Sequence, residues 1–71
     1  MNTNRKLISI KSVCQKLSMS RSSVYRRINP QNRGYDPSFP TPIKLGDSMT
    51  RWEEVEIEQW LQENLDRRNQ A

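Results

Sequence analysis

Near its start the chain carries two apolar helical patterns separated by only three residues. The second pattern is short and places Val24 and Ile28 one helical turn apart. The first follows the i, i+3, i+4, i+7 spacing of one helix face, in Ile10, Val13, Cys14 and Leu17. These spacings predict helices over residues 10–17 and 21–28. Two short helices with so short a break between them are typical of a helix-turn-helix unit.

Serine stands immediately before each predicted helix. Ser9 and Ser20 can each accept a hydrogen bond from a backbone N–H of the first helical turn, which is the role of an N-cap. Met19 precedes the second cap and Val24 is the fourth residue of that helix, so the two are placed as a hydrophobic staple. We therefore expect the angle between the two helices to be fixed.

A loop and a hairpin are predicted after the second helix. Asn29-Pro30 ends the helix, because proline disfavours the helical conformation of the residue before it. The loop that follows, up to Ser38, is longer than most connections in a compact domain, so we interpret it as either functional or mobile. Residues 41–45 and 48–52 then predict two short strands around a tight turn at Gly46-Asp47.

A third helix is predicted over residues 53–65. Acidic residues in its first turn and Arg67 and Arg68 after its end complement the helix dipole. Its apolar stripe consists of Ile57, Trp60, Leu61 and Leu65. We expect Trp52, Trp60 and Cys14 to be core residues. The polar residues 1–6 and 67–71 are expected to be disordered, which leaves residues 7–66 as one domain.

The composition excludes several classes of function. A chain of 71 residues has room for one small core. It has no histidine and one cysteine, which argues against a zinc site, a thiol–imidazole pair or an internal disulfide. No apolar run is long enough to span a bilayer, and no signal-peptide pattern follows the first residues. We expect a cytoplasmic, nucleoid-associated protein that is not an enzyme and needs no metal or cofactor.

Charge is divided unevenly along the chain. Residues 1–51 contain ten Lys and Arg against two acids, a net charge of +8, whereas residues 52–71 contain two against six, a net charge of −4. A concentration of positive charge attracts a polyanion such as DNA. The acidic residues of the third helix, Glu53, Glu54, Glu56 and Glu58, point around a helix rather than converging, so we interpret them as a solvated face.

The second helix is the candidate for entering the major groove of DNA, which admits one helix. We expect Arg21 or Arg26 to contact guanine, Asn29 to contact adenine, and Tyr25 to contact a phosphate or a thymine methyl. Arg27 is expected at the DNA backbone. The serines of the first turn, Ser20, Ser22 and Ser23, suit a phosphate. In the hairpin, we expect Lys44, Ser48 and Arg51 to straddle the DNA backbone or to reach the minor groove.

Residues 8–61 resemble the AlpA-type prophage regulators, which are small winged-helix proteins related to phage excisionases and, more distantly, to the DNA-binding domain of the MerR regulators. The resemblance lies in Val13-Cys14, in residues 19–26 from Met19 to Arg26, in residues 39–46 from Phe39 to Gly46, in Arg51-Trp52, and in residues 56–61. It implies a mainly α fold with a small β-hairpin: a winged helix-turn-helix of three helices plus the wing. Two departures are the long loop at residues 29–38 and Ser12, where relatives often carry Glu.

The resemblance also implies a function. It predicts a sequence-specific transcriptional regulator of prophage or genomic-island origin that binds double-stranded DNA. One alternative is an excisionase, which bends attachment-site DNA and recruits an integrase. An alternative of another class is a protein-interaction module that uses the acidic third helix. We expect a monomer in solution that assembles cooperatively on repeated sites.

Overall fold

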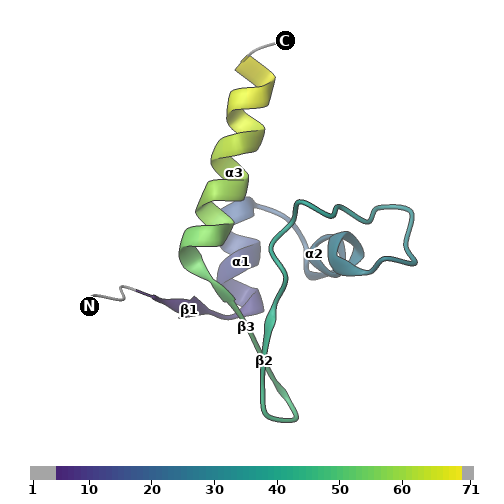
Figure 1. Ribbon diagram of the computed structural model, residues 1–71, viewed down its shortest axis with the longest axis vertical. Helices are drawn as coiled ribbons and strands as arrows, with labels where there is room; N and C mark the ends of the chain where they lie inside the picture. The colour runs from purple at the N-terminus through teal and green to yellow at the C-terminus, as the bar shows by residue number, and fades with distance from the viewer. Residues whose placement is uncertain (1–4, 70–71) are drawn as a thin grey trace.

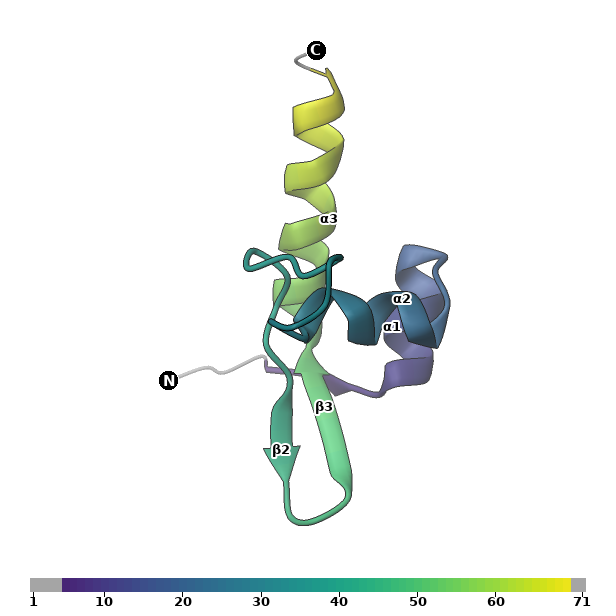
Figure 2. The ribbon, with the colours of Figure 1, turned by 90° about the vertical axis from the view of Figure 1, so that its right-hand side faces the viewer.

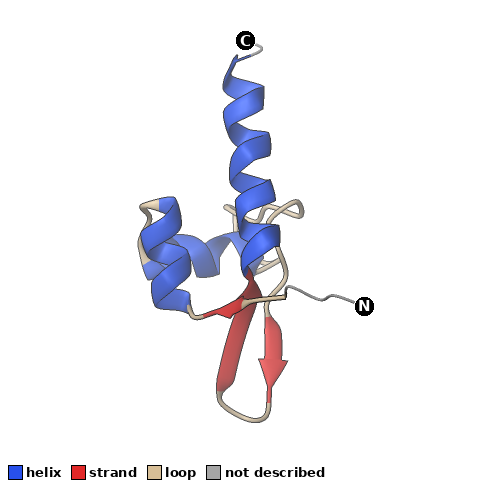
Figure 3. Ribbon diagram, turned by 90° about the vertical axis from the view of Figure 1, so that its left-hand side faces the viewer, coloured by secondary structure: helices blue, strands red, loops and turns tan. Residues whose placement is uncertain are grey.

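Residues 5–69, which the computed structural model describes, form three helices and a small three-stranded antiparallel sheet (Figure 1). The elements in chain order are β1 (Leu7–Ile8), α1 (Ile10–Leu17), α2 (Arg21–Ile28), β2 (Ile43–Leu45), β3 (Met49–Glu53) and α3 (Glu54–Asn69). The predicted mainly α architecture, with three helices and a wing, is confirmed. Figure 3 shows the helices gathered at one end of the sheet and the β2–β3 hairpin extending away from them.

The helix-turn-helix unit has the predicted bounds. The Ser9 side chain accepts a hydrogen bond from Ser12 N–H at 3.4 Å, and the Ser20 side chain accepts one from Ser23 N–H at 3.1 Å, so both serines are N-caps. Ser18 ends α1 in the left-handed conformation, at φ 53°. After this turn α2 crosses α1, as Figure 2 shows. The second helix is therefore held at a fixed angle on the first.

The sheet contains one strand that the sequence did not predict. This strand is β1. The strand order of the sheet is β1-β3-β2, and Ile8 of β1 lies opposite Trp52 of β3. With two residues, β1 is too short to show an alternating pattern. The strand β2 begins at Ile43 rather than Thr41, because Pro42 has no N–H to give to a ladder. The wing turn is one residue longer than predicted and spans residues 46–48, with Gly46 at φ 74°.

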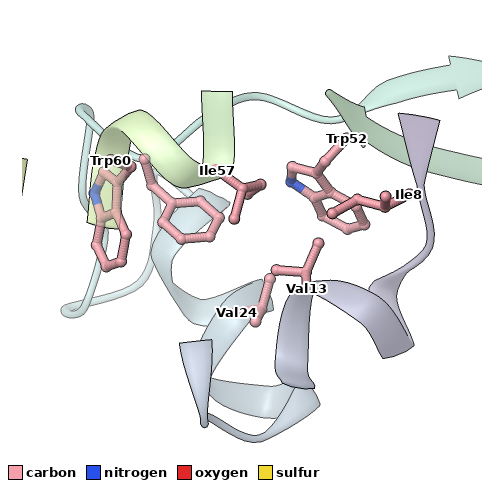
Figure 4. Close-up of a cluster of buried hydrophobic side chains, with 7 residues drawn as sticks. Ile8, Val13, Val24, Trp52, Ile57 and Trp60 are labelled. Carbon is pink, nitrogen blue, oxygen red and sulfur yellow. The ribbon is translucent and has the colours of Figure 1, made fainter. Parts of the chain in front are cut away.

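The core lies where the helix pair, β3 and α3 meet. The fully buried side chains are Val13 of α1, Val24 of α2, Trp52 of β3 and Ile57 of α3. Ile8, Phe39 and Trp60 complete this cluster (Figure 4), and Cys14, Met19 and Leu61 pack against it, partly buried. The predicted core roles of both tryptophans and of Cys14 are confirmed. Because α1 and α3 both contribute side chains to the cluster that contains Val24, they hold α2 in place.

The third helix is longer than predicted. It continues through Asn69, so residues 67–69 are helical where disorder was expected. Its C-terminal half stands clear of the rest of the molecule (Figure 1), and Leu65 is 38% exposed, so this residue was wrongly included in the buried stripe. Before β1, the carbonyl of Lys6 accepts a hydrogen bond from Glu54 N–H at 2.8 Å. The expected disorder of residues 1–4 and 70–71 lies outside the described residues.

Candidate nucleic-acid interface

The exposed face of α2 forms one wall of a shallow polar hollow. Val24 and Ile28 point to the opposite side of the helix, where Val24 is fully buried and Ile28 packs against the core. The hollow is lined by Arg21, Ser22, Tyr25, Arg26, Asn29 and Asn32. The first five of these residues are the ones whose helical spacing placed them on the exposed side. Asn32 comes from the loop after the helix and was not predicted.

Three predicted contact residues are engaged within the protein. The hydroxyl of Ser20 caps the helix and also donates to the Ser23 hydroxyl at 3.1 Å. The guanidinium of Arg27 donates to the Ser23 carbonyl of its own helix at 3.0 Å, and its side chain is half-buried. Arg27 therefore lies along the flank of α2, and its contact with the DNA backbone stays a prediction. The side chains of Ser20 and Ser23 form hydrogen bonds with each other and with the first turn of the helix.

Asn29 also makes a local contact. Its side-chain oxygen accepts a hydrogen bond from Gln31 N–H at 3.0 Å, which turns the chain into the loop. A two-bonded contact with adenine uses both the oxygen and the nitrogen of the amide. The Gln31 contact takes one of the two acceptor positions of this oxygen and orients the amide at the end of α2. Asn29, Arg21 and Arg26 are all exposed.

The wing carries its two positively charged side chains on opposite faces. Lys44 and Thr50 are cross-strand partners, and both line a hollow of about 450 Å³ that Tyr25 borders from α2. Side chains alternate along a strand, so Arg51 lies on the other face of the hairpin, opposite Ile43. The guanidinium of Arg51 donates to the Thr50 carbonyl at 2.9 Å. Ser48 lies exposed in the turn, at the far end of the wing.

Tyr25 joins the two hollows into one surface. Its side chain is 41% exposed and lines both the polar hollow on α2 and the hollow between α2 and the wing. The other side of its ring lies against buried Trp52, with centroids 6.3 Å apart. The tyrosine is thus partly core and partly surface. Through it, the arginines of α2 and Lys44 of the wing belong to one continuous face of the molecule.

The loop after α2 follows a defined course because Asp36 anchors it. The N–H of Asp36 donates to the Arg27 carbonyl at 2.9 Å. Its carboxylate accepts hydrogen bonds from the Ser38 hydroxyl at 2.6 Å and from the Trp60 indole at 3.3 Å. Ser38, and then Trp60 and the charge of Arg27, hold the pKa of Asp36 below its ordinary value, against the effect of burial. These contacts attach the loop to α2 and α3, and the choice between a functional and a mobile loop stays a prediction.

The acidic start of α3 is partly neutralised within the protein. Lys16 of α1 makes ion pairs with Glu54 at 3.1 Å and Glu58 at 3.0 Å, and these hydrogen bonds raise the pKa of the lysine. Arg5 pairs with Glu53 at 3.1 Å. The opposite charges of the two chain segments therefore meet along this side. In residues 5–69 no group of three potential ligand side chains is placed to hold a metal ion.

Sequence reasoning missed three residues of this face. Thr50 was not predicted as a contact residue, because it has no charge and its neighbour Arg51 was the more obvious candidate. Asn32 and Gly34 come from the loop, and only the folded chain brings them back against α2. The Asn-x-Gly spacing, typical of a tight turn, was the available signal.

None of the helices in the described part of the chain has the length and apolar character needed to cross a membrane.

Two short helices joined by a capped turn, with a hairpin beside the exposed face of the second, define a winged helix-turn-helix protein. The chain belongs to the AlpA family: the model of the family described as Prophage CP4-57 regulatory protein (AlpA) matches residues 6–65. It is 36% identical over 56 residues to the DNA-binding transcriptional activator AlpA of Escherichia coli (strain K12), covering 79% of this chain and 80% of that protein. No solved structure gives a significant match.

Proposed function

We propose that this protein is a transcriptional regulator of prophage origin that binds double-stranded DNA with α2 in the major groove. The observation that carries the proposal is the continuous face formed by the arginines of α2, Tyr25 and Lys44. A duplex that receives a helix in its major groove brings a sugar–phosphate strand beside that helix. The hollow beside α2 is floored mainly by apolar residues of the loop, and Lys44 and Thr50 stand on its wing side, from which they can reach a phosphate of that strand.

The role of each residue in this face follows from how exposed its side chain is and from whether it already makes hydrogen bonds within the protein. Arg21 and Arg26 have exposed side chains whose guanidinium groups can form two parallel hydrogen bonds with guanine. Lys44 and the hydroxyls of Tyr25 and Thr50 hold the backbone strand, and Arg27 contacts it from the helix flank. The name of the relative from Escherichia coli, a DNA-binding transcriptional activator, supports the same function.

The protein acts by binding rather than by catalysis. Its surface arginines, tyrosine and lysine lie in an open face, with no nucleophile and base brought together there. We place it at the nucleoid, in the cytoplasm, as a monomer in solution. Sedimentation of the free protein tests the monomer, and sedimentation with a purified integrase tests whether a recombination partner binds it.

A binding titration tests the proposal. Labelled fragments of the DNA that flanks the protein's own gene are titrated in the presence of excess nonspecific competitor, at low and at moderate salt. The proposal predicts a discrete complex at a promoter that survives the competitor and weakens with salt, by a slope of about −0.9 per phosphate contact. A complex that any competitor abolishes equally would reduce the basic face to general electrostatics. A specific complex at an attachment site instead would favour the excisionase function.

A further inference from the structure

The loop between α2 and β2 packs closely on an arginine of the exposed helix face. A Cβ atom placed on Gly34 would lie 2.9 Å from both the Cγ and the Cδ of Arg26. Carbon atoms that are not bonded to each other normally stay near 3.5–4.0 Å apart. Glycine therefore leaves the space that the aliphatic part of this arginine occupies.

The need for glycine at position 34 comes from this contact and not from the backbone. Gly46 is the glycine with a positive φ in residues 5–69, whereas Gly34 has an ordinary one. An alanine at position 34 would cost no backbone strain of the left-handed kind. It would displace a flexible side chain and leave the fold of the loop in place.

Hydrogen bonds hold this part of the loop against the helix. The side-chain oxygen of Asn32 accepts from Gly34 N–H at 2.9 Å, and its carbonyl accepts from Tyr35 N–H at 3.1 Å. The N–H of Asp36 donates to the Arg27 carbonyl, next to Arg26 on α2. The loop is thus attached to the helix that carries the arginine, and Gly34 stays beside it.

The consequence concerns the charged end of Arg26. A long side chain on an exposed helix face normally samples many rotamers, and binding must then select one of them. Here the loop limits the stem of Arg26 on one side. The same arginine lines the polar hollow with Arg21, Tyr25 and Asn29, and Asn32 of the loop completes the wall.

We propose that the loop Asn29–Ser38 is a specificity element of the DNA interface. Gly34 positions Arg26 so that its guanidinium meets a base edge in the orientation that two parallel hydrogen bonds require, and Asn32 adds a polar side chain to the same hollow. Gly34 is a positioning residue that acts through Arg26. The inference rests on the proposed function, because it needs a duplex on the exposed face of α2.

The variant Gly34→Ala tests this role. We expect it to lower the affinity for the specific site about tenfold, since a misplaced arginine loses the discrimination of a two-bonded guanine contact. Nonspecific affinity should stay within about twofold, because the charge is unchanged. Circular dichroism and thermal unfolding should match the wild type. Gln31→Ala is the matched control, since it changes an exposed residue of the same loop that lines neither hollow.

A double-variant cycle separates positioning from general damage. In an Arg26→Ala background, Gly34→Ala should have no further effect on the specific site. Equal effects of Gly34→Ala in both backgrounds, or no loss of specific affinity in the wild-type background, would overturn the proposal.

A measurement on the free protein distinguishes failure of the proposed DNA-binding function from failure of the specificity role of Gly34. Nuclear Overhauser contacts between the Hα atoms of Gly34 and the Hγ and Hδ atoms of Arg26 should be present in the free protein. If these contacts are present and no specific site exists, the proposed function fails and the specificity role falls with it. If specific binding exists and the contacts are absent, the specificity role alone fails.

Discussion

The indole of Trp60 donates a hydrogen bond to the carboxylate of Asp36, with 3.3 Å between Nε1 and Oδ2, and so attaches the loop after α2 to α3. The other carboxylate oxygen accepts from the N–H and the hydroxyl of Ser38, at 2.9 and 2.6 Å. The N–H of Asp36 donates to Arg27 of α2. One residue thus links the loop to two helices, to α2 through its backbone and to α3 through its side chain.

Asp36→Asn is expected to destabilise the protein at neutral pH. The pKa of Asp36 lies below its ordinary value of 3.8, chiefly because Ser38 donates to the charged form. A carboxylate with a lower pKa in the folded state contributes stability that is complete above the unfolded pKa and is lost as pH falls through the folded one. We expect the substitution to cost about 1–2 kcal/mol near neutral pH. The difference from the wild type should shrink in acid, as urea unfolding at both conditions would show.

Asp47→Asn is the control for this prediction. Asp47 lies exposed in the wing turn, so its substitution removes one negative charge and none of the anchoring contacts. We expect its unfolding free energy to match the wild type at both pH values. Equal losses in the two aspartate variants would mean that net charge, rather than the anchored loop, accounts for the change.

Trp60→Ala is expected to remove much of the stability of so small a core. The Trp60 side chain is 8% exposed and lies edge-on to Phe39, with centroids 4.8 Å apart. We expect a loss of about 3–5 kcal/mol in thermal or urea unfolding followed by circular dichroism. Leu65→Ala, on the projecting part of the same helix, should cost less than about 1 kcal/mol. A Trp60→Ala variant with normal unfolding and no DNA binding would instead make this indole part of the interface.

Local patterns determined the helix-turn-helix unit well. The bounds of α1 and α2 follow from the apolar spacing and from Ser9 and Ser20, whose capping contacts reach only three residues along the chain. Predictions that depend on distant pairing were less successful. The strand β1 has two residues and exists because β3 offers a partner. The end of α3 was placed too early, because its polar last turns carry no burial signal.

The composition of the candidate site was easier to predict than its geometry. The exposed face of α2 follows from helical periodicity, and Arg21 and Arg26 both line the hollow on that face. Lys44 and Arg51 looked equivalent in the sequence, whereas the register of the hairpin puts them on opposite faces. The contact of Gly34 with Arg26 needs a loop that returns to its own helix, which no periodic pattern describes.

Arg26→Ala is expected to reduce sequence discrimination. If Arg26 contacts a guanine, its loss should cost about 1–3 kcal/mol at the specific site and should level the affinities for sites that differ at that base pair. Competition titrations with a set of single-base variants of the site would measure this. Arg68→Ala is the control, because it removes the same charge from an exposed position in the last turn of α3, away from α2 and its loop. An equal loss on every sequence would make Arg26 a phosphate contact.

Lys44→Ala and Arg51→Ala are expected to differ, although both remove one positive charge from the wing. Lys44 shares a hollow with Tyr25 of α2, whereas Arg51 lies on the opposite face of the hairpin. Loss of one phosphate contact should flatten the dependence of log affinity on log salt by about 0.9. We expect this change for Lys44→Ala on every sequence and a much smaller one for Arg51→Ala. Equal changes would show that DNA contacts both faces, so that the hairpin straddles the backbone strand instead of holding it on the α2 side.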